Sequence, residues 1–131
     1  MEVVLAHIAA NEIENVLFLS GDEHLSCIAR ARLQAENCNP VEIVSIHGSP
    51  LYAPLPFANG RASNFQAKDS FSFLHQSIRI DIASETRFSE TGDGFALIVI
   101  QRQPHDYIQH VEFIGEEDKV SVDLQRTAYH S

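Results

Sequence analysis

The sequence predicts an α+β fold that is mostly β, with one N-terminal helix followed mainly by antiparallel strands. Near the N-terminus apolar residues recur at helical spacing, and this stripe comprises Val4, Leu5, Ile8 and Ala9. Further along, short apolar runs alternate with turn residues at a spacing typical of β-sandwiches. The chain of 131 residues is long enough for one domain with its own core. We therefore expect a single domain over residues 1–131.

The first two elements are expected to be a helix over residues 2–13 and a buried strand. Asn15 interrupts the helical pattern, and the apolar run Val16–Leu19 follows it. A short continuous run of this kind is typical of a strand buried on both faces of an α/β sheet. Such a strand has parallel neighbours, which we do not expect the rest of the sequence to supply. It ends in a polar loop, residues 20–24, and open α/β sheets place their chemistry in such loops.

The middle of the chain predicts a hairpin and then a long loop. Residues 27–33 and 41–46 read as two strands joined by a turn at Asn39-Pro40. The segment 47–69 is rich in Pro, Gly, Asn and Ala. Loops of this length without secondary structure of their own are usually functional or mobile.

The second half predicts more strands. Isoleucines at alternate positions from 78 to 82 indicate a strand with one solvent-exposed face. Gly92-Asp93-Gly94 is a hairpin turn signal, and residues 95–100 predict a buried strand. Two further strands are expected at residues 111–113 and 120–124, with a turn at 115–119.

Composition excludes several classes of protein. The net charge of −9 argues against a nucleic-acid-binding surface. No stretch approaches the roughly 20 apolar residues of a membrane span. The N-terminus lacks the basic start and cleavage site of a signal peptide, which favours a cytoplasmic location. Cys27 and Cys38 would not lie opposite one another in the expected hairpin, so we expect two small thiols rather than a disulfide.

The strongest chemical signal is the loop that contains Asp22 and His24. Gly21 allows a sharp turn, so the carboxylate and the imidazole can point at one position. This pair of ligands suits metals such as Zn, Fe or Mn, but a catalytic site needs three or more protein ligands. The residues alone therefore predict at most half of a metal site. The alternative is that Asp22 only caps the segment that follows it.

The string Asn15–His24 is similar to the last metal-binding motif of the PhoD-like (alkaline phosphatase D) group of metallophosphoesterases. In that group a buried strand runs into Ser-Gly-Asp-x-His, which matches residues 20–24 here. The stretches 42–45, 49–51 and 53–55 and the terminal strands also resemble this group.

The resemblance implies that His24 is a ligand of one metal in a dinuclear site. Asp22 stands where the wider superfamily has a histidine ligand of the other metal, and a carboxylate there favours Ca, Mg, Mn or Fe over Zn. The cofactors implied for an intact enzyme are therefore Fe, Ca, Mn or Zn ions, and this chain alone is not expected to need one. Of the superfamily's earlier motifs, residues 22–24 formally fit the first, Asp-x-His, but the other three are not found in the sequence, so residues 20–24 fit better as the closing motif of a longer chain. The resemblance thus implies the C-terminal half of an αββα sandwich that is inactive alone, with the remaining ligands upstream of Met1.

Other polar residues carry weaker hypotheses. His47 opens the long loop and is a candidate phosphate contact or third ligand, although a loop histidine without a role is the simpler interpretation. Arg61 in the same loop is a candidate contact for a substrate phosphate, although a solvated loop residue is the simpler interpretation. The other histidines are assigned no role, and Ser20 has no plausible Ser-His-Asp relay around it.

Two functions follow. An intact protein would hydrolyse phosphate monoesters or diesters, with the substrate bound through the missing N-terminal part. The alternative is a non-catalytic β-rich binding or interaction domain. In either case we expect no nucleic-acid or membrane partner, and a sheet cut from its parent predicts a homodimer through the exposed sheet.

Overall fold

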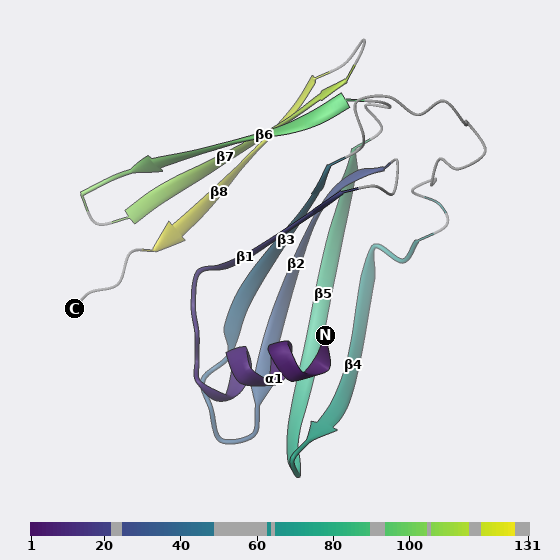
Figure 1. Cartoon of the computed structure of the whole chain (residues 1–131), viewed down its shortest axis with the longest axis vertical. Coiled ribbons are helices and arrows are strands. Elements are labelled where there is room, and N and C mark those ends of the chain that lie inside the picture. The colour runs from purple at the N-terminus through teal and green to yellow at the C-terminus, as the bar shows by residue number, and fades with distance from the viewer. Residues whose placement is uncertain are drawn as a thin grey trace. The chain divides into compact units, whose positions relative to one another are not determined.

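The computed structural model describes residues 1–21, 25–48, 63, 65–89, 94–104, 106–115 and 119–127. These residues form one short helix and two sheets, so the protein is mostly β (Figure 1). The five-stranded sheet has the order β1-β3-β2-β5-β4, and the three-stranded sheet has the order β6-β7-β8. The elements are α1 (Glu2–Ala10), β1 (Val16–Gly21), β2 (Ser26–Ala35), β3 (Val41–Gly48), β4 (Lys68–His75), β5 (Ile78–Ser89), β6 (Gly94–Arg102), β7 (Asp106–Gly115) and β8 (Lys119–Thr127).

The chain divides into two compact units. One contains α1 and most of the five-stranded sheet. The other contains the three-stranded sheet together with the ends of β1, β2 and β3 at Ser20–Gly21, Ser26–Cys27 and His47–Gly48. None of the helices in the described residues is long and apolar enough to cross a membrane.

The core of the first unit lies between α1 and one face of the five-stranded sheet. Alternate residues of β2, β3 and β5 point to the helix, because side chains of a strand alternate between its two faces. The fully apolar cluster comprises Ala6, Ile8, Ala9, Leu33, Ala35, Val41, Ile43, Ile80 and Ile82. The prediction of a strand with alternating isoleucines is confirmed, since Ile80 is 0% and Ile82 is 5% exposed.

The helix ends at Ala10, three residues earlier than expected. Glu12 adopts a left-handed conformation with φ of 49°. The N–H of Glu12 donates to the carbonyl of Ala9, and the N–H of Ile13 donates to that of Ile8. These two bonds are the pattern of a Schellman motif, which normally uses glycine at the position of Glu12. The sequence therefore contains no recognisable stop signal at the point where the helix ends.

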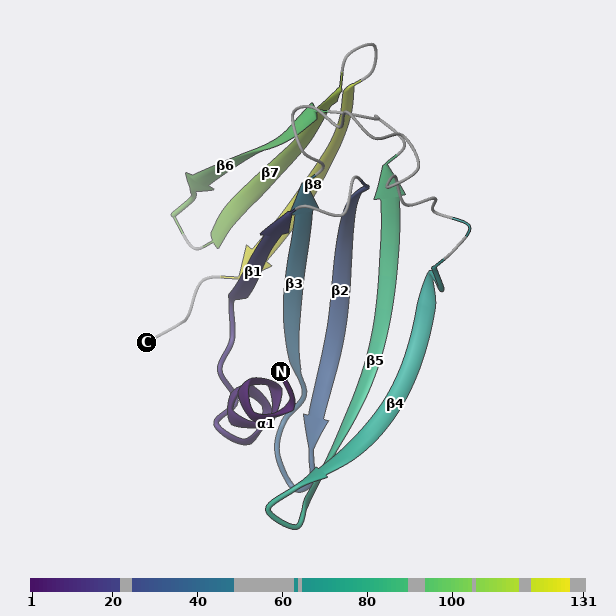
Figure 2. The same cartoon turned by 45° about the vertical axis from the view of Figure 1, so that its right-hand side comes forward.

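The prediction that residues 16–19 form a strand is confirmed, but its burial on both faces is wrong. β1 lies at the edge of its sheet, and its one neighbour among the described strands is β3. Val16 and Phe18 pack on the core, whereas Leu19 is 64% exposed. β1 and β3 run in the same direction (Figure 2). The chain thus supplies a parallel neighbour for β1, which the sequence did not lead us to expect.

The predicted hairpin of β2 and β3 is confirmed, and both cysteines are half-buried and not joined by a disulfide. A second hairpin, formed by β4 and β5, was missed in part, because β4 was not predicted. Its turn consists of Gln76 and Ser77, with φ of 48° and 68°. Two consecutive left-handed residues define a type I′ turn, which normally carries Asn-Gly. Most of the predicted long loop lies outside the described residues.

The predicted strands at residues 111–113 and 120–124 are confirmed as parts of β7 and β8, which pair with Val111 opposite Val122. The strand at residues 95–100 is also present, as part of β6, but its predicted burial is wrong. Phe95, Leu97 and Val99 are 46%, 42% and 37% exposed, because β6 is an edge strand whose only partner in the described residues is β7.

Gly92-Asp93-Gly94 does not join a pair of hairpin strands, since β5 and β6 belong to different sheets. Residues 92 and 93 themselves lie outside the described residues. Gly94 begins β6, where a Cβ atom would lie 2.0 Å from the carbonyl oxygen of Ile114. Only glycine therefore fits at this point of the β6–β7 pair.

Candidate functional site

The predicted metal loop lies at the end of β1. Asp22 and His24 themselves are outside the described residues, as is Arg61. The residues on either side of the loop are described: Gly21 ends β1, and Leu25 and Ser26 are buried at the start of β2, with 8% and 3% exposure. The loop therefore begins at a strand end and returns directly into a buried position.

His47 lies beside the start of this loop. Its Nδ1 shares a hydrogen bond with the hydroxyl of Ser20 at 2.8 Å, two residues before Asp22. The next residues of each strand are also close, because a Cβ atom on Gly21 would lie 3.4 Å from the carbonyl oxygen of Gly48. These contacts follow from the parallel pairing of β1 and β3, which brings the carboxyl ends of both strands to the same edge.

The same end of β3 packs closely on β6. A Cβ atom on Gly48 would lie 3.5 Å from the Cβ of Ala96. Gly21 and Gly48 thus lie where three strand segments of the second unit approach one another. A Cβ atom at either position would make an ordinary van der Waals contact with these neighbours.

The described residues do not form a metal site by themselves. Among them, no group of three or more His, Cys, Asp or Glu side chains is placed to hold a metal ion. His47 is the one sequence-predicted candidate that is described, and a single imidazole beside a hydroxyl is too few ligands for a catalytic metal. The ligand roles of Asp22 and His24 stay predictions.

A charged cluster on β7 and β8 was missed by sequence reasoning. His110 contacts the carboxylate of Asp123 through Nδ1, and its Nε2 lies 3.0 Å from Oε1 of Glu112. Lys119 places its Nζ 2.8 Å from the same oxygen of Glu112. The register explains the cluster, because His110 lies directly opposite Asp123 and Glu112 follows two residues later on the same face.

These contacts shift two pKa values. Hydrogen bonds that the His110 ring donates to Asp123, and next to Glu112, raise the pKa of His110 above its ordinary value. Lys119, and next His110, lower the pKa of Glu112. Since both ring nitrogens of His110 contact carboxylates, neither is left to activate a nucleophile. The cluster therefore fits an electrostatic link between two strands better than a general base.

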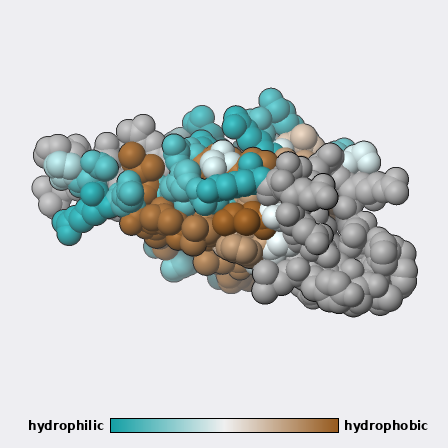
Figure 3. Space-filling view, turned by 90° about the horizontal axis from the view of Figure 1, so that it is seen from above, coloured by the Kyte–Doolittle hydropathy of each residue, from teal (hydrophilic) through white to brown (hydrophobic). Residues whose placement is uncertain are grey.

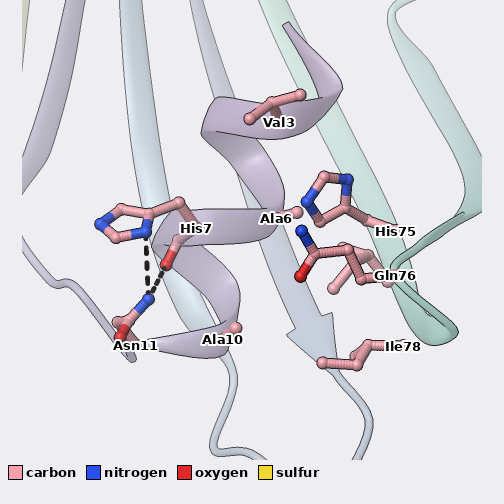
Figure 4. A pocket seen from close by; sticks show the side chains of 9 residues that line it. Val3, Ala6, His7, Ala10, Asn11, His75, Gln76 and Ile78 are labelled. Atoms are coloured by element: carbon pink, nitrogen blue, oxygen red, sulfur yellow. Dashed lines mark hydrogen bonds between the residues drawn. The ribbon is translucent and has the colours of Figure 1, made fainter.

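A groove in the first unit lies between α1 and the β4–β5 turn and has a volume of about 310 Å³ (Figure 4). Its floor is apolar and includes Ala6 and Ile80. His75 and Gln76 lie on the side of the turn, and His7 on the other side is turned toward Asn11. The two histidines do not point at one position, so they do not form a pair of metal ligands.

A second groove, of about 470 Å³, lies on the face of the five-stranded sheet opposite α1. Its lining is mixed, with polar side chains such as Arg32 and Arg79 beside apolar ones. The guanidinium of Arg79 donates to Asp81 at 2.8 Å and to the hydroxyl of Ser72 at 3.2 Å. This groove offers hydrogen-bonding groups but, among the residues that the structure describes, no group of side chains that could hold a metal.

No protein-family model matches the chain, and neither a curated protein nor a solved structure matches it. The resemblance to PhoD-like phosphatases therefore has the motif at residues 20–24 as its main support.

Proposed function

We propose that this chain supplies the last metal-ligand loop of a metal-dependent phosphoesterase. The observation that supports the proposal most is the hydrogen bond between Ser20 and His47, because it brings an imidazole next to the start of the Ser-Gly-Asp-x-His loop. Both groups lie at the carboxyl ends of parallel strands, which is where α/β sheets carry catalytic loops.

In the proposed site, the carboxylate of Asp22 and the imidazole of His24 are metal ligands. His47 holds the loop through Ser20 and contacts either the metal or the substrate phosphate. Bound metals of this class supply positive charge to the phosphoryl oxygens and lower the pKa of a water molecule. The carboxylate at position 22 favours Fe, Mn or Ca over Zn. The remaining ligands would come from polypeptide outside these 131 residues, in a fold of the αββα type.

Calorimetric titration with Mn²⁺, Ca²⁺ and Zn²⁺ tests the proposed ligands. We expect weak binding of Mn²⁺ to the unaltered chain, and at least about tenfold weaker binding to Asp22→Asn and to His24→Gln. His75→Gln is the matched control, because His75 lies in the groove beside α1, and it should bind like the unaltered chain. Equal affinities for all four proteins would contradict the ligand assignment.

An assay with a chromogenic phosphate ester tests the second part of the proposal. The chain alone should give no metal-dependent hydrolysis above the rate of the His24→Gln variant, because most ligands of a dinuclear site are not in this sequence. Hydrolysis that the unaltered chain catalyses and His24→Gln does not would show that the site is complete without further polypeptide.

The alternative function is a non-catalytic β-rich binding or interaction domain. Two features favour it: the groove around Arg79 and the exposed apolar side chains of β6. In that case no metal binds at the loop, and the Asp22→Asn and His24→Gln substitutions leave every binding property unchanged. The same calorimetric series therefore separates the two functions.

A further inference from the structure

The edge strand β6 lacks the features that normally prevent an edge strand from pairing with a strand of another chain. Of its nine residues, only Arg102 at its end is charged, and none is proline. Natural edge strands usually carry a central lysine, a proline or a bulge that prevents pairing with another chain. The described residues include one pairing partner for β6, the strand β7, on one side.

The side chains of β6 are unusually apolar for an exposed strand. Phe95, Leu97 and Val99 point to one face and remain 46%, 42% and 37% exposed, while Ile100 on the other face is 61% exposed. The space-filling view shows one face of the molecule, on which hydrophobic residues gather beside hydrophilic ones (Figure 3). Exposed apolar side chains that lie together, as on β6, mark interaction sites.

The sequence of β6 is complementary to itself in the antiparallel direction. With two copies aligned about Ile98, the middle of Gly94–Arg102, Leu97 lies opposite Val99 of the second copy. Phe95 then lies opposite Gln101, and Arg102 opposite Gly94. Each of these pairs places residues of the same face together, and no charge meets a like charge.

We propose that β6 pairs antiparallel with β6 of a second copy of this chain, which joins two three-stranded sheets into one of six strands. A second copy fits better than a charged peptide, because the strand has no acidic residue and only one basic residue with which to select one. Pairing satisfies the backbone groups along the edge of β6 that has no strand partner in the described residues, and it covers part of the exposed apolar row.

The contact between two copies of β6 is small, so we expect the two copies to associate weakly. Even a fully buried aromatic side chain accounts for only about 150–250 Å². Covering four partly exposed side chains on each copy therefore buries on the order of several hundred Å² of solvent-accessible surface. Buried areas of this size are found in transient interfaces. The chain's net charge of −9 also opposes association of two copies. We expect a dissociation constant of about 10 μM to 1 mM.

Sedimentation of the unaltered chain over this concentration range should show a monomer–dimer equilibrium. Leu97→Lys should weaken it at least about tenfold, since a lysine at the centre of an edge strand blocks pairing. Leu74→Lys is the matched control and should leave it unchanged, because Leu74 is 74% exposed on β4, the edge of the other sheet. Both variants carry less net negative charge, so altered repulsion between copies cannot explain a loss specific to Leu97.

Disulfide trapping tests the register. In a background with Cys27 and Cys38 replaced by alanine, Ile98→Cys should form a dimer under oxidation, because directly opposite residues in antiparallel strands lie at about 4.5–5.5 Å between Cα atoms. Phe95→Cys should not form a dimer, because position 95 of one copy lies opposite Gln101 of the other. The two introduced cysteines are therefore six residues apart along the paired strands. A monomer at all concentrations, equal effects of the two lysine variants, or equal trapping at both positions would overturn the proposal.

Discussion

The five-stranded sheet with α1 and the three-stranded sheet of β6–β8 are stabilised in different ways. The first has an all-apolar layer between helix and sheet, with Leu33, Ala35 and Ile80 at 0% exposure. In the second, Val111 and Phe113 are buried beside the polar Gln109, and a charged cluster links β7 to β8. The comparison shows that buried alternate residues do not require a covering helix. β7, the central strand of the second sheet, has them although its unit contains no helix in the described residues, whereas the edge strand β6 does not.

The largest expected difference in stability is between leucine-to-alanine substitutions in the two sheets. Leu33→Ala should lower the free energy of unfolding by about 2–5 kcal/mol, because it leaves a cavity in a fully packed layer. Leu97→Ala should cost less than about 1 kcal/mol, because Leu97 is already 42% exposed. Urea denaturation of the two variants measures the difference, and similar losses would show that the two sheets are packed equally well.

Gln109, a buried polar residue of β7, tests whether the packing of the three-stranded sheet can be improved. It is 2% exposed, and its Nε2 has no hydrogen-bond partner in the described structure. A buried amide without a partner destabilises a fold by roughly 1–3 kcal/mol. We therefore expect Gln109→Met, which is similar in volume, to raise the free energy of unfolding by about 1 kcal/mol in urea denaturation. A loss of stability would indicate that the amide is needed for a contact.

A substitution in the turn between β4 and β5 should raise the free energy of unfolding by a smaller amount in the first unit. Ser77 has a φ of 68°, and left-handed backbone conformations are unfavourable for residues with a Cβ atom. Ser77→Gly should therefore stabilise the protein by about 0.5–1 kcal/mol in thermal or urea denaturation. Ser70→Gly, within β4, is the control and should destabilise by a similar amount, because glycine weakens a strand interior. If both changes destabilise, the turn is not strained.

The smallest effect is the pH dependence contributed by His110. Its pKa is raised in the folded state, so the stabilisation is fully present below the ordinary histidine pKa of about 6.5 and is lost as the pH rises through the higher folded value. His110→Gln should remove this part of the decline in stability above pH 6.5. His75→Gln, whose site contains no carboxylate, is the control. Equal pH profiles for the two variants would exclude a role for the cluster.

Sequence reasoning succeeded where a local pattern decides the structure. The alternate isoleucines at 78–82 and the apolar runs of β2, β3, β7 and β8 predicted strands that are present. It failed where non-glycine residues take left-handed conformations, as at Glu12, Gln76 and Ser77. The strand β4 was missed for a related reason, because its turn carries no glycine or asparagine and its first residues are polar.

Burial and side-chain partners were harder to predict, because they depend on which strands are neighbours. The burial of β1 and β6 was overestimated, since both are edge strands. The cluster at His110 depends on the β7–β8 register, although the predicted strands 111–113 and 120–124 could have suggested it. The contact of Ser20 with His47 depends on the parallel pairing of β1 with β3, which no local pattern reveals.

The proposed metal loop is tested most directly by nuclear magnetic resonance with paramagnetic Mn²⁺, which broadens only the signals close to the ion. The account predicts that substoichiometric Mn²⁺ selectively broadens the signals of Asp22, His24 and His47, and that those of His75 and His110 stay sharp. Broadening centred on His110 and Asp123, or no selective broadening at residues 20–24, would contradict it.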